Sequence, residues 1–224
     1  MRYCENHNPE RMKKYVLALT FSSLAALAWA QPARVPVNEP NTTSGNTTQP
    51  TYQQTNTNPT SQNQTYAKLT DAELTKYSDG QGRFSISYPT NWTLNKNPDN
   101  AVIQITSPKE KDEDNFRQNI NLQIEDMGNR SQTIEQYVKI NMDAVKDLIK
   151  GYREVSSMYF NRNGGRVYEV VYKGKYGGID YEIQIKQLFA VSNGKAFILT
   201  YVSKEDERDV FETTANKIFN TFKY

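Results

Sequence analysis

The sequence predicts an α+β domain in which two helices pack against a mainly antiparallel sheet. Most segments after residue 67 alternate apolar and polar residues, which is the period of half-buried strands. Turns rich in Asn and Gly at 161–165 and 192–195 favour hairpins, and hairpins make neighbouring strands antiparallel. Segments 133–150 and 204–222 instead repeat apolar residues at helical spacing.

The first half of the predicted domain contains short strands. Residues 71–77 suggest a short helical turn, and Pro89 ends a strand over 84–88. Further strands are expected over 101–106 and 119–125. In the second of these, alternation points Ile120, Leu122 and Ile124 into the core and Asn121, Gln123 and Glu125 toward solvent.

Segment 133–150 is the clearest helix. Thr133 and Gln136 fit a capping box, in which each side chain satisfies an unpaired backbone amide. Gly151 follows the last turn, where glycine is favoured. The apolar stripe of this helix comprises Ile134, Tyr137, Val138, Val145, Leu148 and Ile149.

Four strands and a second helix are expected after it. The strands span 152–160, 166–173, 179–191 and 196–202. The last of them is apolar on both faces, which predicts a central place in the sheet. The C-terminal helix is expected over 204–222, with Ser203 as its cap and acidic residues in its first turn, as the helix dipole favours.

The N-terminus has the layout of a secretory signal peptide. A basic head precedes an apolar run over 15–27, and Ala28 and Ala30 are small residues at the cleavage positions. A membrane anchor is the less favoured alternative, because a span needs about 20 apolar residues. We expect residues 1–30 to be cleaved, translation to start at Met12, and the protein to be periplasmic or extracellular.

A low-complexity segment follows the leader. Residues 31–68 are dominated by Asn, Thr, Gln, Pro and Ser, which bury too little apolar surface to offset the entropy of folding. We therefore predict a disordered linker there. The folded domain is expected over 69–224, an ordinary size for one domain.

Cleavage of the predicted leader would also remove the residue types that several kinds of catalytic and metal site require. Cys4 and His7 are the only Cys and His, so the mature chain offers no disulfide, no Cys or His catalysis and no Cys/His zinc site. The leader holds four of the 27 basic and two of the 25 acidic residues, which leaves 23 of each. A neutral mature chain argues against nucleic-acid binding, which uses a strongly basic face.

Two acidic groups are candidates for chemistry. Asp112, Glu113 and Asp114 could hold Ca²⁺, but the EF-hand spacing is absent and lysines interleave, so a solvated loop is favoured. Asp180 and Glu182 share one face of a predicted strand and could flank a cleft. We favour their pairing with Lys or Arg on a neighbouring strand. No catalytic residue, cofactor or metal site is assigned.

Aromatic side chains are weaker candidates for a ligand platform. Tyr168, Tyr172 and Tyr181 lie on predicted strands and could stack a ligand or a partner. We expect them instead to be core rings with the hydroxyl at the rim. Trp92 is expected to staple its loop to the core rather than to bind sugar.

The residues FSISYPTNW at 84–92 resemble the opening strand of PsbP-like domains, which is roughly F-x-x-x-Y-P-x-x-W. The order of elements over 79–224 is similar as well. The resemblance implies an αβα sandwich and an exported, non-enzymatic protein. Plant and cyanobacterial members are extrinsic lumenal subunits that support the oxygen-evolving complex of photosystem II, with calcium and manganese retention. Their proposed metal-associated histidines have no counterpart in this domain, so no site residue is transferred.

These observations lead to one functional hypothesis and two alternatives. We expect an exported, non-catalytic binding or accessory domain that presents a sheet face or a loop edge to a protein of the cell envelope. The first alternative is a carboxylate hydrolase that uses Asp180 and Glu182. The second is a Ca²⁺-binding module at Asp112, Glu113 and Asp114.

Overall fold

The computed structural model describes residues 72–224, apart from 99–100, 111–115, 129–131, 178 and 206–209. The predicted leader and linker therefore lie outside the described residues, as do the Ca²⁺ candidates Asp112, Glu113 and Asp114. Neither described helix has the length and apolar character that a bilayer-spanning segment needs.

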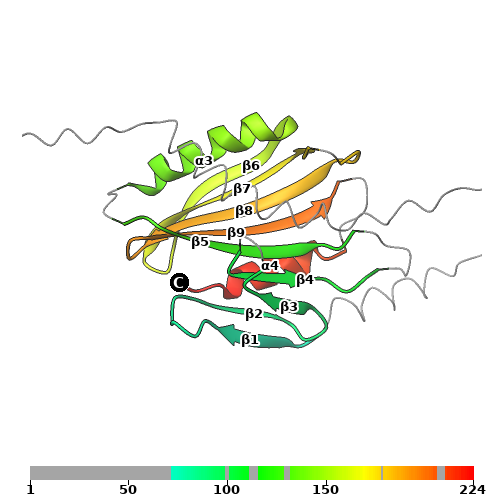
Figure 1. Cartoon of the computed structure of the whole chain (residues 1–224), viewed down its shortest axis with the longest axis vertical. Helices are drawn as coiled ribbons and strands as arrows, with labels where there is room; N and C mark the ends of the chain where they lie inside the picture. Colours follow the sequence, from blue (N-terminus) through cyan, green and yellow to red (C-terminus); the bar gives the residue numbers. More distant parts are fainter. Residues whose placement is uncertain (1–71, 99–100, 111–115, 129–131, 178, 206–209) are drawn as a thin grey trace, which may run out of the picture.

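A seven-stranded antiparallel sheet forms the centre of the domain (Figure 1). Its strands are β3 (Thr93–Lys96), β4 (Ile103–Thr106), β5 (Asn119–Asp126), β9 (Lys195–Lys204), β8 (Ile183–Ser192), β7 (Gly165–Lys175) and β6 (Lys150–Arg162), in that spatial order. β1 (Leu74–Ser78) and β2 (Ser85–Pro89) form a separate two-stranded sheet. β9 lies centrally, as its apolar faces predicted, and both of its neighbours are antiparallel to it.

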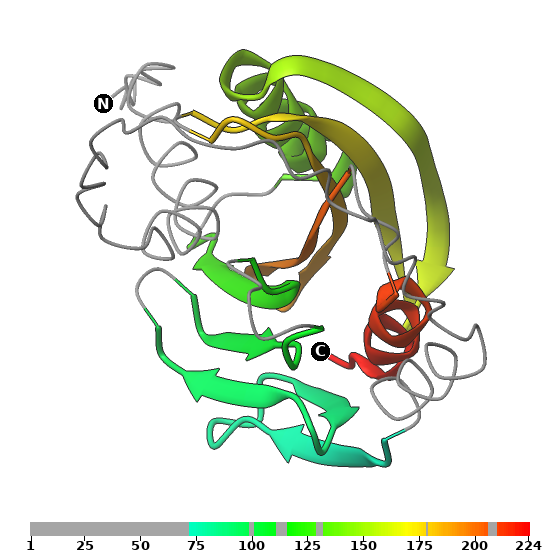
Figure 2. The ribbon, with the colours of Figure 1, turned by 90° about the vertical axis from the view of Figure 1, so that its right-hand side faces the viewer.

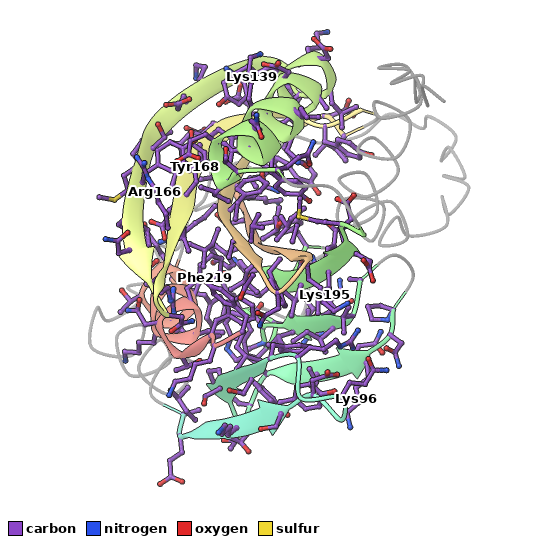
Figure 3. The ribbon with its side chains drawn as sticks, turned by 90° about the vertical axis from the view of Figure 1, so that its left-hand side faces the viewer. Lys96, Lys139, Arg166, Tyr168, Lys195 and Phe219 are labelled. Atoms are coloured by element: carbon purple, nitrogen blue, oxygen red, sulfur yellow. The ribbon has the colours of Figure 1, made fainter. Side chains whose placement is uncertain are left out.

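One helix covers each face of this sheet, which confirms the α+β sandwich. α3 (Ile134–Leu148) packs its apolar stripe on one face, against side chains such as Phe189 and Ile198. α4 (Glu212–Thr221) packs on the other face, against a cluster that includes Leu122 and Leu199. Figure 3 marks the two helices by Lys139 on α3 and Phe219 on α4.

The capping box of α3 and the turn signals of the hairpins are confirmed. The predicted end of the helix is not, because α3 ends at Leu148 with Ile149 as its C-cap, and Gly151 lies within β6. The Thr133 side chain accepts a hydrogen bond from the backbone N–H of Gln136. The Gln136 side chain in turn accepts one from the backbone N–H of Thr133. Both predicted hairpin turns contain an Asn-Gly pair with positive φ. The pairs are Asn163–Gly164 and Asn193–Gly194.

The prediction of a helical turn over 71–77 is wrong. Leu74–Ser78 is strand β1, which pairs with β2 from Leu74 opposite Pro89 to Ser78 opposite Ser85. The hydrogen bonds of this pairing come from residues about ten positions away in sequence, so a local helical pattern does not decide the outcome. Strand β3 was not predicted, because Leu94 is its one apolar residue and the segment shows no alternation.

The start of the last helix was also predicted wrongly. β9 continues to Lys204, and Ser203 lies opposite Gln184 in the sheet rather than capping a helix. α4 begins only at Glu212, and its N-cap residue, Phe211, makes no side-chain cap. Strand pairing with β8 therefore extends to Lys204, the residue at which the helix was expected to begin.

The polar face of β5 differs from the prediction. Ile120 and Leu122 are fully buried as expected, yet Asn121 and Gln123 are also buried, at 2% and 4% exposure. Asn121 donates a hydrogen bond to the side chain of Asn119 at 2.6 Å, so part of this polar face is satisfied along the strand itself.

Candidate interaction surface

The two carboxylates proposed for hydrolysis do not share a strand. β8 begins at Ile183, which lies opposite both Gly174 of β7 and Lys204 of β9. Asp180 and Glu182 precede that point, and the backbone carbonyl of Glu182 accepts a hydrogen bond from the backbone amide of Glu205 at 3.0 Å. The Asp180 backbone carbonyl accepts a hydrogen bond from Lys175 at 2.9 Å.

Glu182 is held in an ion pair across the sheet. Its two carboxylate oxygens accept hydrogen bonds of 3.0 and 2.8 Å from the guanidinium of Arg153 on β6. This hydrogen bonding lowers the pKa of Glu182. A general acid needs the opposite shift. The expected pairing of Glu182 with a basic residue is confirmed, but Arg153 lies on β6, which is separated from β8 by β7, rather than on a neighbouring strand.

The predicted aromatic residues are mostly core residues. Tyr172 is buried at 1% exposure, and its hydroxyl donates to the side chain of Gln187 at 3.0 Å. Trp92 is buried at 3% exposure and meets the ring of Phe211 edge-on at 5.4 Å, as expected of a staple. Tyr181 is only half-buried and packs edge-on against Phe116.

A stack of side chains ties the end of β6 to α3. The rings of Tyr159 on β6 and Tyr168 on β7 lie 4.6 Å apart. The guanidinium of Arg166 lies 4.7 Å above the Tyr159 ring and pairs with Glu135 of α3 at 3.1 Å. Figure 3 shows Arg166 and Tyr168 on the same strand. This stack links β6 to the helix through an exposed ion pair, which contributes little to stability.

β6 is an edge strand with one unpaired side. It has 13 residues and pairs with β7, and no other described strand adjoins it. In Figure 2, β6 is the outermost ribbon of the curved sheet. The free backbone N–H and C=O groups of such an edge can pair with an added strand.

Exposed apolar side chains concentrate on this edge. Among the described residues the large hydrophobic side chains with high exposure are Val155 at 54%, Met158 at 57% and Leu74 at 44%. Two of the three lie on β6. An exposed edge that also carries apolar side chains is a typical contact surface for another polypeptide.

The geometry of β6 divides it into two parts. Register shifts occur between Lys150 and Arg153 and again between Glu154 and Ser156, and such bulges bend and twist an edge. From Ser156 to Arg162 the pairing with β7 is continuous. The regular part, Ser156–Arg162, is therefore the stretch that offers a straight template, and Met158 lies within it.

The charges beside this edge are paired. On the α4 side of the sheet, Lys173 contacts Glu205 at 2.9 Å and Lys186 contacts Glu169 at 3.0 Å. Arg153 and Glu182 form the pair described above. The surface next to Met158 is thus polar but nearly balanced in charge, which favours an apolar contact surrounded by a polar rim.

One feature limits the chemistry of the described residues. Within them, His, Cys, Asp and Glu do not gather in any group of three or more that could hold a metal ion. The β6 edge itself was missed from the sequence. Segment 152–160 holds two adjacent charged residues, Arg153 and Glu154, and two adjacent serines, and this lack of alternation was the available signal for an exposed, bulged strand.

Fold and surface together define a small αβα-sandwich domain with one open, partly apolar sheet edge. The PsbP family model matches residues 72–224, and the chain belongs to the PsbP family. This confirms the resemblance seen in the residues at 84–92. No curated protein matches the sequence significantly.

Several solved structures resemble the chain. Cyanobacterial PsbP (CyanoP) from Synechocystis is 14% identical, with a TM-score of 0.48, and the match covers 68% of this chain and 92% of CyanoP. LpqN of Mycobacterium tuberculosis, described as involved in cell envelope biogenesis, is 14% identical, with a TM-score of 0.49 and coverage of 69% and 93%. The yeast Ran-binding protein Mog1p is 7% identical, with a TM-score of 0.48 and coverage of 68% and 95%.

Proposed function

We propose that this chain is an exported, non-catalytic binding domain of the cell envelope, which docks an extended segment of an envelope protein along β6. The signal-like pattern at 15–30 and the neutral mature charge support export and argue against a nucleic-acid partner. Membership of the PsbP family supports the accessory role that the resemblance implies.

The open edge of β6 is the observation that carries the proposal. An added strand would satisfy the free backbone groups over Ser156–Arg162, and main-chain hydrogen bonds would supply much of the affinity. An apolar side chain of the partner would cover Met158, which is 57% exposed. The occupant is therefore an extended segment with apolar residues at alternate positions.

The paired charges favour binding over catalysis. The pKa of Glu182 is lowered by its hydrogen bond to Arg153, and an active-site acid or base usually has its pKa shifted toward neutrality. The hydrolase alternative would need Asp180 and Glu182 to act together. Arg153 must first release Glu182 for that to happen.

Capture from envelope extracts tests the proposal through matched variants. Met158→Glu places a charge on the regular part of β6, and Leu74→Glu makes the same change at a similarly exposed apolar residue on β1. Partner recovery, and the affinity of the purified partner, should fall about tenfold for Met158→Glu. Leu74→Glu should bind like the parent.

Two results would contradict the proposal. Equal loss, or no loss, in the two variants would remove β6 from the binding surface. A dimer of the purified protein that Met158→Glu dissociates, seen by light scattering, would assign this edge to a second copy of the chain instead. Far-UV circular dichroism of both variants confirms that the fold is intact.

A further inference from the structure

A row of neutral polar side chains crosses the α3 side of the sheet. In register, Asn95 of β3 lies opposite Gln104 of β4, and Gln104 lies opposite Asn121 of β5. Asn121 lies opposite Thr200 of β9, which lies opposite Gln187 of β8. We call these five residues the amide row. Five neighbouring strands thus place an amide or hydroxyl at the same level of one face.

The inner members of the amide row are hydrogen-bonded in two separate groups, one around Gln187 and one around Asn121. The Tyr172 hydroxyl donates to Gln187 Oε1 at 3.0 Å, and Gln187 Nε2 donates to Thr200 Oγ1 at 3.1 Å. Asn121 donates to Asn119 at 2.6 Å. Gln187, Thr200 and Asn121 are 2–3% exposed. Such a satisfied network holds its members in fixed orientations.

The outer half of the amide row is accessible. α3 makes its main contacts with β6, β7 and β8, which lie at the other end of the sheet from β3 and β4. Asn95 is exposed, and Gln104 is half-buried. The neighbouring Thr93 and Thr106, which lie opposite each other, add two hydroxyls to the same face. This outer part presents donors and acceptors without a formal charge.

The chemistry of this surface favours an uncharged ligand with many hydroxyl groups. An amide offers two donors and one acceptor oxygen, and a threonine hydroxyl both donates and accepts. A sugar ring carries hydroxyl groups around its rim, and each of them can both donate and accept a hydrogen bond. A charged ligand would find no counter-charge in the amide row and would lose hydration. An extended peptide binds better at a sheet edge, where its backbone groups can form hydrogen bonds with the edge strand.

We propose that the amide row is a binding surface for a neutral oligosaccharide. Asn95 and Gln104 contact the sugar hydroxyls, and the buried members keep the sheet rigid beneath them. This surface is separate from the β6 edge, because β3 and β6 are opposite edges of the seven-stranded sheet. The inference therefore goes beyond the docking function proposed above.

Calorimetry and NMR titration with two neutral hexasaccharides, chitohexaose and cellohexaose, test this proposal. The parent protein should show saturable binding to at least one of them. Asn95→Leu and Gln104→Leu should each weaken it about tenfold, because each removes amide hydrogen bonds to the ligand. Asn161→Leu makes the same change at an exposed asparagine of β6 and should leave sugar binding unchanged.

Three outcomes would overturn the inference. The first is the absence of saturable binding to both sugars, and the second is binding that Asn95→Leu and Gln104→Leu leave intact. The third is preferential binding of a peptide corresponding to residues 41–49, which would assign the face to a polypeptide. Met158→Glu must retain sugar binding, so failure of the docking proposal and failure of this inference are distinguishable.

Discussion

Arg162 of β6 donates a hydrogen bond of 3.2 Å to the backbone carbonyl of Phe222, the C-cap residue of α4. The same nitrogen also donates to the carbonyl of Phe219. The last carbonyls of a helix lack partners within the helix, and they carry the negative end of its dipole. Burial lowers the pKa of Arg162 without making it neutral. One cation therefore joins the β6–β7 hairpin to the C-terminal helix.

Replacing Arg162 should detach that helix end. Arg162→Leu leaves two carbonyls without their charged donor, and we expect a loss of about 1.5–3 kcal/mol in the free energy of unfolding. Arg162→Lys should lose less, because one ammonium can still reach a carbonyl. Urea unfolding followed by far-UV circular dichroism measures both. The matched change at the exposed Arg166 should cost less than Arg162→Leu, and the reverse order would refute the assignment.

Gly174 permits β7 to approach the junction between α3 and β6. A Cβ at this position would collide with the side chain of Ile149 and lie 3.0 Å from the carbonyl oxygen of Lys150. Gly174→Ala should therefore destabilise the protein by about 1–3 kcal/mol through overpacking. Gly177→Ala is the control, since a Cβ there meets nothing within 4 Å. Equal melting temperatures for the two variants would contradict this steric account.

The capping box at the start of α3 should contribute measurably to stability. Thr133→Ala removes the side chain that accepts from the Gln136 amide, and we expect a cost of about 1 kcal/mol. Thr213→Ala, an exposed position within α4, serves as the control and should be near neutral or slightly stabilising, because alanine is the better helix former. Chemical denaturation of both variants measures this difference in the free energy of unfolding.

Asp79 should make stability depend on pH in the acid range. Its carboxylate accepts hydrogen bonds of 2.8 and 3.0 Å from Arg83, and this contact is the main cause of its lowered pKa. A carboxyl with a lower pKa in the folded state stabilises the fold above its unfolded pKa, about 3.9. That contribution is lost as the pH falls through the lower, folded value.

Denaturation curves between about pH 2 and pH 6 measure this effect. The parent protein should lose stability in the acid part of this range, and Asp79→Asn should show a flatter profile with lower stability near pH 6. A double-mutant cycle with Arg83→Gln separates the pair from its surroundings. Parallel profiles for the parent and Asp79→Asn would show that other groups control the acid transition.

Much of the architecture followed from local patterns. The capping box of Thr133 and Gln136 and the two Asn-Gly turns were predicted because each depends on residues adjacent in sequence. The core positions Ile120 and Leu122 followed from strict alternation. Strand β1 and the extension of β9 to Lys204 were not predicted, because pairing with another strand decided both.

The candidate surfaces were harder to predict than the fold. Glu182 was expected to pair with a basic residue on a neighbouring strand, but the identity of Arg153, 29 positions earlier, required the structure. The free edge of β6 depends on which strand ends the sheet, and alternation within one strand carries no such information. The same is true of the amide row, whose members come from five strands.

By itself, the sequence determined the α+β class, the main helix with its cap, the hairpin turns and the neutral charge of residues 31–224. These properties depend on composition or on contacts within a few residues. Only the tertiary structure decided that β6 is an edge exposing Met158, and that Asn95, Gln104 and Asn121 share one row. Strand order and register are set by packing between distant segments, so the surfaces built on them appear only when the chain is folded.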